Sequence, residues 1–250
     1  MFFNTHTHLN SSEQYQHLEE YLDHCRKENV TELTVVGYNK DTSIIAVELS
    51  KQYEHIHATV GISPNDLDDY KEEDLEVIET LIKENKVVAL GEIGLDYHYD
   101  TPKDLQIDVF KKQLALSKKY HLPVVIHCRD AYEDTYNLLK EYDVKGIMHC
   151  YSGSVEMAKR FVNLGFYISL SGTVTFKNAK EPKKVAKEIP LEYLLIETDD
   201  PYLTPVPFRG TTNQPAYCIY VASTIAECKE IDIKVVEEAT YNNAKKVFGL

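Results

Sequence analysis

Short apolar segments alternate with longer amphipathic stretches along the whole chain. Several of these segments, such as Val87–Leu90 and Pro123–Ile126, are nearly uninterrupted apolar runs, which is typical of parallel strands covered by helices. Eight is also the number of strands that closes a parallel β/α barrel. We predict eight strands, near Phe2–Leu9, Glu32–Tyr38, His57–Ser63, Val87–Leu95, Leu122–Cys128, Gly146–Cys150, Phe166–Ser171 and Tyr193–Thr198.

The stretches between the predicted strands have helical spacing. After the fourth strand, Pro102 stands where a helix begins, a position at which its missing N–H costs little. Ile107, Phe110 and Leu114 then fall on one face of that helix. This alternation predicts a strand followed by a helix, repeated along the chain.

The pattern predicts a single (β/α)8 (TIM) barrel domain that spans residues 1–250. A chain of 250 residues is the usual size for such a barrel. The rival architecture is an open, doubly wound sheet, but its glycine-rich phosphate turn, G-x-G-x-x-G, is absent from the sequence. In a barrel, the functional site is expected at the carboxyl ends of the strands.

The charge distribution limits the partners that the protein can bind. The net charge is −13, and it is concentrated in residues 1–100, which hold 7 basic and 21 acidic residues, whereas residues 101–250 hold 20 and 19. A general nucleic-acid coat protein is basic, so any contact with nucleic acid is expected to be local and confined to the second part of the chain. The acidic excess is otherwise explained as a contribution to solubility.

Other features of composition indicate where the protein works. No basic, apolar leader occurs at the N-terminus, and no run of about 18 apolar residues predicts a membrane span. The five cysteines are an odd number without C-x-x-C spacing, which favours a reducing compartment, and we predict the cytoplasm. No segment points to an obligatory protein partner.

Two histidines near the N-terminus could bind one metal ion together. His6 and His8 stand two residues apart on the first predicted strand, and side chains at this spacing lie on the same face. An H-x-H pair alone is a weak signal. Its importance depends on what the ends of the other strands carry.

Four further ionisable residues lie at or near the carboxyl ends of other predicted strands: Glu92, His127, His149 and Asp199. Buried ionisable groups are costly unless they are paired or bind a metal. The alternative is that all six residues are core polar groups with satisfied hydrogen bonds, which requires the same explanation six times. We therefore predict a metal centre with ligands His6, His8, Glu92, His127, His149 and Asp199.

The ligand types narrow the choice of metal. Imidazole and carboxylate suit Zn, Mn or Fe, and carboxylate with water also accepts Mg. Cys128 and Cys150 each follow a predicted ligand histidine, so strand alternation should point them away from the site as packing residues. Of the remaining histidines, only His98 follows a strand closely enough for us to expect a contact with substrate.

Eight segments resemble the TatD family of metal-dependent deoxyribonucleases, within the amidohydrolase superfamily. They run in order over nearly the whole chain: NTHTHLN, VGISPND, ALGEIGLDYH, LPVVIHCRDA, GIMHCYSGS, LSGTVTFKNAK, LLIETDDPYLTPVPFRG and YNNAKKVFGL. The resemblance implies a distorted β/α barrel with one to three divalent ions. It also implies 3′→5′ exonuclease or phosphodiesterase activity on DNA.

The resemblance also assigns roles to individual residues. His6 and His8 match the family's first metal pair, Glu92 matches its bridging carboxylate, and Asp199 matches its last-strand aspartate. His127 and His149 match the family's second-metal histidines. Arg129 and Arg209 match positions that can face the substrate phosphate. We expect two ions of Mg, Mn or Zn, catalytic roles for Asp199 and Glu92, and Asp199 as acceptor of the proton of the attacking water.

Four positions depart from the family pattern. Asn4 replaces a usual aspartate, and Ser63 stands where a histidine is common. Thr211 follows Arg209 in place of basic residues, and Asp200 replaces a small neutral residue. The ligands are retained while the rim is less basic. The departures leave open a metal-dependent amidase, lactonase or deacylase acting on a small substrate, because the same centre can attack a carbonyl. They also leave open whether the substrate is single-stranded DNA ends or a small phosphodiester.

Overall fold

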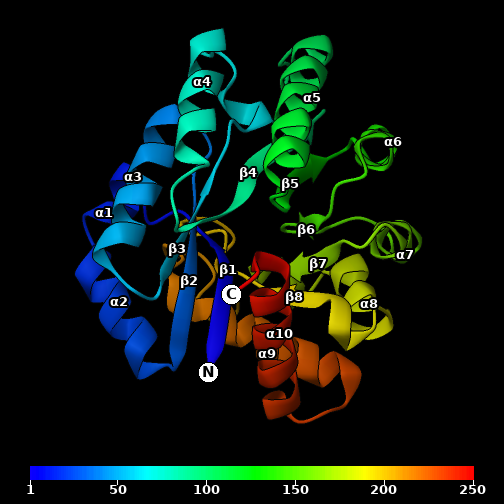
Figure 1. Ribbon diagram of the computed structural model, residues 1–250. Coiled ribbons are helices and arrows are strands. Elements are labelled where there is room, and N and C mark those ends of the chain that lie inside the picture. The colour runs from blue at the N-terminus through cyan, green and yellow to red at the C-terminus, as the bar shows by residue number, and fades with distance from the viewer.

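The computed structural model describes residues 1–250 as eight parallel strands, each joined to the next by a helical connection (Figure 1). The strands are hydrogen-bonded in the order of the chain, from β1 to β8. Their bounds are β1 Phe2–Thr7, β2 Val30–Val36, β3 Ile56–Val60, β4 Val87–Asp96, β5 Val124–Arg129, β6 Gly146–Met148, β7 Tyr167–Leu170 and β8 Leu194–Ile196. The predicted (β/α)8 barrel and its eight strands are confirmed.

The seam between β8 and β1 is held together differently from the contacts between the other neighbouring strands. Neighbouring strands from β1 to β8 form parallel ladders, but no ladder joins β8 to β1. The chain after β8 crosses this gap, where the backbone N–H of Asp199 donates to the carbonyl of His6 at 3.1 Å. The barrel is therefore nearly closed, and its open seam lies beside two of the predicted metal ligands.

The helices lie around the strands, and α10 lies beside β1 and β8 (Figure 1). Their bounds are α1 Ser12–Tyr15, α2 Leu18–Lys27, α3 Lys40–Gln52, α4 Glu72–Leu81, α5 Lys103–Tyr120, α6 Tyr132–Tyr142, α7 Val155–Asn163, α8 Lys180–Glu188, α9 Cys218–Lys229 and α10 Ile233–Phe248. Pro102 precedes α5, and Phe110 and Leu114 are buried on the face that the sequence predicts.

Two apolar clusters form the core. The larger one lies between the strands and the surrounding helices, where alternate strand residues such as Leu33 and Val35 face outward. The smaller one contains residues near the amino ends of the strands, among them Phe3 and Val125, and it is covered by Phe248 of α10. Because apolar side chains fill the amino end, the polar side chains of the barrel gather at the opposite, carboxyl end. No helix is both long enough and apolar enough to span a membrane.

Candidate metal centre

The six predicted ligands meet at the carboxyl end of the barrel. His6, Glu92 and His127 stand on β1, β4 and β5, whereas His149 and Asp199 lie in the loops directly after β6 and β8. His8 follows the last residue of β1. The polar atoms of three triplets lie within 4.8 Å of one another: His6, His149 and Asp199; His6, His8 and Glu92; and Glu92, His127 and His149.

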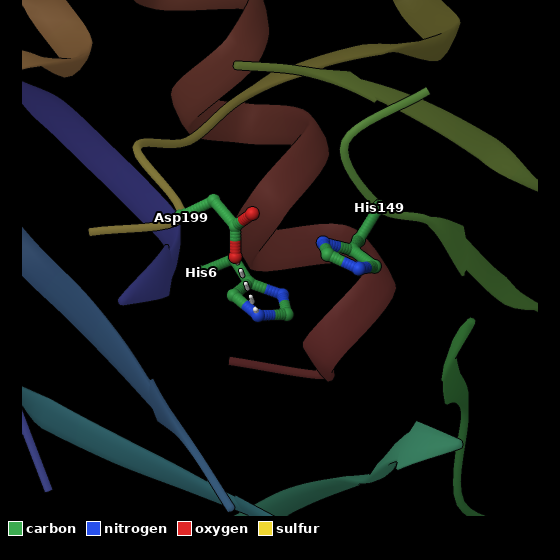
Figure 2. A group of neighbouring side chains, drawn as sticks. All are labelled: His6, His149 and Asp199. Carbon is green, nitrogen blue, oxygen red and sulfur yellow. Dashed lines mark ion pairs between the residues drawn. The ribbon is translucent and has the colours of Figure 1, made fainter. Parts of the chain in front are cut away.

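The first part of the centre, which we call the β1/β8 half, consists of His6, His8 and Asp199. The Nε2 atoms of His6 and His8 are 3.2 Å apart, and they lie 3.6 Å and 3.4 Å from Oδ1 of Asp199. The ring of His6 stacks on that of His149, with centroids 4.1 Å apart, beside the Asp199 carboxylate (Figure 2). The polar atoms of His6, His8 and Asp199 thus face one point.

The second part, the β4–β6 half, consists of Glu92, His127 and His149. Oε1 of Glu92 lies 2.9 Å from Nδ1 of His127 and 3.2 Å from Nε2 of His149. Its other oxygen, Oε2, faces the β1/β8 half, at 3.8 Å from His6 and 3.9 Å from His8. Glu92 therefore presents one oxygen to each half.

The spacing of these atoms fits divalent metal ions. In the β1/β8 half, the nitrogen–oxygen separations of 3.4–3.9 Å are longer than ordinary hydrogen bonds. Ligand atoms that surround one ion with bonds of about 2.0–2.2 Å lie roughly 3–3.6 Å from one another. The Asp199 oxygen lies at this distance from the His6 and His8 nitrogens, and the Glu92 oxygen is slightly farther away. Four imidazoles and two carboxylates at this spacing are a donor set that Zn, Mn or related ions accept.

Two carboxylates outside the predicted ligand set orient the histidines. Oδ2 of Asp96 lies 2.8 Å from Nε2 of His127, and Oε1 of Glu197 lies 3.3 Å from Nδ1 of His149. Such partners fix the ring orientation and the tautomer of a ligand histidine. Neither carboxylate was predicted from the sequence, although Asp96 stands four residues after Glu92 on the same strand and hence on the same face.

A close approach of β4 and β5 sets the position of the β4–β6 half. Gly94 is paired with His127 in the ladder and has a φ of +147°. A Cβ atom at Gly94 would lie 1.9 Å from the carbonyl oxygen of His127, far inside van der Waals contact. Only glycine accepts both this contact and this backbone conformation.

Side chains fasten the open seam behind the β1/β8 half. Nδ2 of Asn4 donates to Oγ1 of Thr198 at 2.8 Å and to the carbonyl of Pro215 at 3.0 Å. The Thr198 hydroxyl in turn donates to Asp200, which also accepts from the Thr7 hydroxyl at 2.8 Å. Asn4 and Asp200, two of the departures from the family pattern, are thus joined through Thr198 in one buried hydrogen-bond network.

Asp199, the last of the six predicted ligands, is held in an uncommon backbone conformation. Its φ is +57°, in the left-handed region that few residues other than glycine adopt. Strained residues of this kind cluster at functional sites when the surrounding structure holds them. Here the backbone N–H bonded to His6 fixes the turn, so the carboxylate points back over the barrel mouth.

The charges of the centre balance one another. Burial alone would lower the pKa of His8, but the Asp199 and Glu92 carboxylates raise it to about 9. Burial and the neighbouring His149 and His8 rings hold the pKa of His6 well below its usual value. Burial would raise the pKa of Glu92, yet the facing His149 and His127 rings hold it well below its ordinary range. These opposed shifts show a compact group of charges in which each carboxylate is stabilised by imidazoles.

Asp200 differs from this group because no histidine contacts it. Burial raises the pKa of Asp200 to about 6, against the effect of the two threonine hydroxyls that donate to it. Its carboxylate faces the seam, where Thr7 and Thr198 flank the ligand positions. This places Asp200 behind the metal centre as a fastening group.

The predicted substrate-contact residues lie on the rim. Arg129 ends β5 and Arg209 lies in the loop after β8, and both are exposed. The chain has four arginines; the other two, Arg26 and Arg160, pair with carboxylates, whereas no ion pair involves Arg129 or Arg209. His98 is also exposed, but its Nδ1 lies 3.6 Å from a carboxylate oxygen of Asp130.

The remaining sequence candidates lie outside the cluster of ligand atoms. The thiols of Cys128 and Cys150 contact hydroxyls of Thr135 and Ser171, at 3.3 Å and 3.1 Å, and neither belongs to a metal-binding triplet. Ser63 accepts a hydrogen bond from the N–H of Asn65 at the start of a 3-10 turn. The cysteines therefore act in packing, as the strand alternation predicts.

Comparison with known proteins adds to this geometry. Residues 3–249 match the family model described as TatD related DNase. The chain is 49% identical over 254 residues to YabD of Bacillus subtilis strain 168, an uncharacterized metal-dependent hydrolase, and the match covers 100% of both chains. It is 39% identical to an uncharacterized metal-dependent hydrolase of Mycoplasma genitalium, over 99% of this chain and 98% of the relative.

Solved structures agree with the sequence relatives. The crystal structure of YjjV, a TatD homologue from Escherichia coli K12, is 30% identical and superimposes with a TM-score of 0.95, over 100% of this chain and 98% of that one. A TatD family hydrolase from Entamoeba histolytica has the same fold, with 24% identity and a TM-score of 0.87 over 98% and 97% of the two chains.

Proposed function

The chain belongs to the family of TatD-related DNases and is a metal-dependent hydrolase; from this premise we propose that it cleaves phosphodiester bonds of DNA at single-stranded ends. The direction proposed is 3′→5′. The observation that carries the proposal is the convergence of six ligand side chains with two unpaired arginines on the rim above them.

Two divalent ions, of Mg, Mn or Zn, are proposed for the centre. His6, His8 and Asp199 would hold one ion, His127 and His149 would hold the other, and Glu92 would contribute to both sites. The stack of His149 on His6 brings the two halves into contact, which supports a shared rather than a divided centre. Bound divalent ions make water more acidic and offset the negative charge that develops on phosphate.

Asp199 is proposed as the residue that accepts the proton of the attacking water. Its side chain is 16% exposed, twice the 8% of Glu92, so it reaches the space that substrate and water enter. Burial would raise the pKa of Asp199, but the hydrogen bond with His8 and the nearby His149 and His6 rings hold it well below its ordinary range, so the side chain is ionised. An ionised carboxylate can accept the proton of a water that a bound divalent ion has made more acidic. Glu92 takes part by orienting both halves.

Arg129 and Arg209 are proposed to bind the substrate phosphate. A guanidinium group donates two parallel hydrogen bonds to phosphate oxygens. The alternative, that each arginine serves a structural ion pair, has no support because neither has a carboxylate partner, in contrast to Arg160 and Glu133 at 2.6 Å. His98 has such a partner in Asp130, so its proposed contact with substrate is the weaker one.

The test is a comparison of substrates on one preparation of the protein. We expect hydrolysis of bis-p-nitrophenyl phosphate and of a single-stranded oligonucleotide, and little of a p-nitrophenyl ester or a lactone. Exhaustive chelation should abolish activity, and Mg, Mn or Zn added singly should restore it. Ester or lactone hydrolysis with no cleavage of either phosphodiester would replace our proposal by the amidase, lactonase or deacylase class. Full activity after chelation, with the absence of metal verified by elemental analysis, would overturn the metal mechanism.

A substitution completes this test. Asp199→Asn should lower kcat by roughly 10²-fold or more, the range for a residue that transfers a proton. The control is His17→Ala, because His17 is exposed, belongs to none of the metal-binding triplets, and forms an ion pair only with Glu20 at 3.4 Å. Equal activities of the two variants would show that Asp199 is not the acceptor.

A further inference from the structure

Two exposed tyrosines flank the mouth of the barrel. Tyr202 is 66% exposed and Tyr99 is 55% exposed, and they stand in the loops after β8 and β4. In a barrel of eight strands in chain order, β4 and β8 lie on opposite sides. We propose that Tyr99 and Tyr202 are stacking platforms for unpaired nucleobases on the two sides of the scissile phosphate. The proposal rests on the proposed phosphodiesterase function and names the side chains that would bind the unpaired bases of its substrate.

Tyr202 has a fixed backbone and a free ring. Its N–H donates to the carbonyl of Asp199 at 3.1 Å, and its own carbonyl accepts from Nδ2 of Asn213 at 2.6 Å. The backbone is therefore tied directly to a predicted ligand and to a buried asparagine. The ring, in contrast, is largely exposed to solvent, so it has little part in packing.

Tyr99 is tied to the opposite half of the centre. In its loop, the N–H of His98 donates to Asp96 at 2.9 Å, and Asp96 also contacts His127 at 2.8 Å. The Arg129 guanidinium lies 5.5 Å from the centre of the Tyr99 ring. An aromatic ring thus accompanies one of the two unpaired rim arginines.

The β7–β8 side has a similar combination. The Arg209 guanidinium lies over the ring of Phe176, 3.7 Å from its centre, and Arg209 stands in the same loop after β8 as Tyr202. Each side of the mouth therefore combines one arginine, for phosphate, with an exposed aromatic ring. Proteins that bind single strands use this combination of positive charge and stacking rings.

The charge of the protein explains why stacking is needed. With a net charge of −13 and only two unpaired arginines at the mouth, attraction to phosphates is weak. Stacking does not depend on net charge and works with every base, because every base has an aromatic face. Bases inside a duplex do not expose those faces, so the arrangement favours unpaired ends over paired ones.

The experiment compares two substrates with three tyrosine positions. The substrates are a single-stranded oligonucleotide and a strand of the same length whose last two residues lack bases. Tyr99→Ala and Tyr202→Ala should each raise KM for the normal strand by about fivefold or more, as expected from the loss of one stacked base. We expect kcat to stay within about twofold, the abasic strand to be unaffected, and Tyr→Phe at either position to behave as wild type.

The control is Tyr15→Ala. Tyr15 is 47% exposed, so it is a solvent-facing tyrosine like Tyr99 and Tyr202. It lies on α1 near Tyr53, whose pKa it helps to raise, and it is not one of the proposed stacking residues. It should leave KM for both strands unchanged. An unchanged KM in both rim alanine variants, or an equal rise on the abasic strand, would overturn the stacking role. Failure of the proposed function looks different, because the wild-type protein would then cleave neither strand.

Discussion

In the β4–β6 half of the centre, Glu92 and His127 stand on neighbouring strands joined by a backbone ladder, with Gly94 pressed against His127. In the β1/β8 half, no ladder joins the strands that precede Asp199 and carry His6, and the seam is fastened by side chains. The β4–β6 half is therefore positioned by the close approach of two backbone strands. The β1/β8 half is positioned by hydrogen bonds between buried side chains.

Because the two halves are positioned differently, they should be sensitive to different substitutions. A backbone-positioned half should be sensitive to added volume and tolerant of changes in charge. A half fastened by Asn4, Thr198 and Asp200 should be sensitive to the balance of donors and acceptors, because a buried polar group without a partner costs about 1–3 kcal/mol. Substitutions that change only one of these properties can separate the two cases.

The largest effect is expected from Gly94→Ala. The new Cβ would lie 1.9 Å from the His127 carbonyl at a φ of +147°. Strained backbone costs about 1–3 kcal/mol and overpacking a further 1–3 or so, which together lower the free energy of unfolding by roughly 2–6 kcal/mol. Urea unfolding monitored by circular dichroism measures it.

Gly210→Ala is the matched control for this change. Gly210 also has a positive φ, +88°, but no atom lies within 4 Å of a Cβ built there. It should lower the free energy of unfolding by only about 1–2 kcal/mol, from backbone strain alone. Equal losses at Gly94 and Gly210 would mean that the close approach of β4 and β5 does not position the half.

A double-mutant cycle at the seam should show the opposite sensitivity. Asn4→Asp places a second carboxylate beside the Thr198 hydroxyl, which has one hydrogen and already donates to Asp200. We expect a loss of roughly 3 kcal/mol in the free energy of unfolding, in the range for an uncompensated buried charge. Asp200→Asn should cost about 1–3 kcal/mol, because one threonine hydroxyl loses its acceptor.

The variant with both changes should lose less than the sum of the single losses. The Thr198 hydroxyl can then donate to the carboxylate at position 4 and accept from the amide at position 200. This gives a coupling free energy between the two substitutions of about 0.5–3 kcal/mol. Some loss remains, since the Pro215 carbonyl loses the Asn4 donor. Strictly additive losses, measured by the same unfolding curves, would show that positions 4 and 200 act independently.

Asp96→Asn should weaken metal binding with little loss of stability. Asp96 accepts from both the His98 N–H and His127, and an asparagine must turn its NH2 group toward one of these donors. Loss of such a partner typically lowers metal affinity by about 10–100-fold. Titration calorimetry with Mn or Zn measures the change. Asp100→Asn, an exposed position in the same loop, should bind metal as the wild type does, and equal affinities of the two variants would remove Asp96 from the centre.

The same contrast explains what the sequence could predict. The barrel follows from periodicity, because apolar runs locate the strands. The six predicted ligands follow from their places at or near the carboxyl ends of those strands. His6 and His8 also reveal a shared face by their spacing. Asp96 was within reach of the same rule, since it follows Glu92 by four residues.

The seam could not be predicted in this way. Asn4 and Thr198 are 194 residues apart, and their bond depends on how the last strand meets the first. The sequence shows Asn4 and Asp200 as two separate departures from a family pattern. Only the direction of the Thr198 hydroxyl, which donates to one and accepts from the other, makes them a single unit. The phosphate contacts of Arg129 and Arg209 were predicted from the family resemblance, but the sequence could not show whether either arginine has a carboxylate partner, and the structure records an ion pair for neither.

The smallest effect is expected from changes in charge at the rim. The salt dependence of single-strand binding then tests whether the two halves share one substrate path. Each half has one unpaired arginine above it, Arg129 on the β5 side and Arg209 on the β8 side, so binding of a single strand should depend only mildly on salt. Each phosphate neutralised on a single strand contributes a slope of about −0.7 in log K against log salt, which predicts a wild-type slope on the order of −1 to −2.

Thr211→Lys with Thr212→Arg adds charge to the β8 side alone. Both threonines are exposed, and the one hydrogen bond lost, from Thr211 to the Phe208 carbonyl at 2.8 Å, lies at the surface. The slope should become steeper by about 1 to 1.5, because two more phosphates are neutralised, and KM for an oligonucleotide should fall. Turnover of a small phosphodiester should change little, since that substrate does not reach the rim. Thr80→Lys with Asn85→Arg adds the same charge on and after α4, at exposed positions away from the mouth, and should leave the slope unchanged. A wild-type slope near −5, or the same response from both double variants, would mean that the strand does not pass over the β8 side of the mouth.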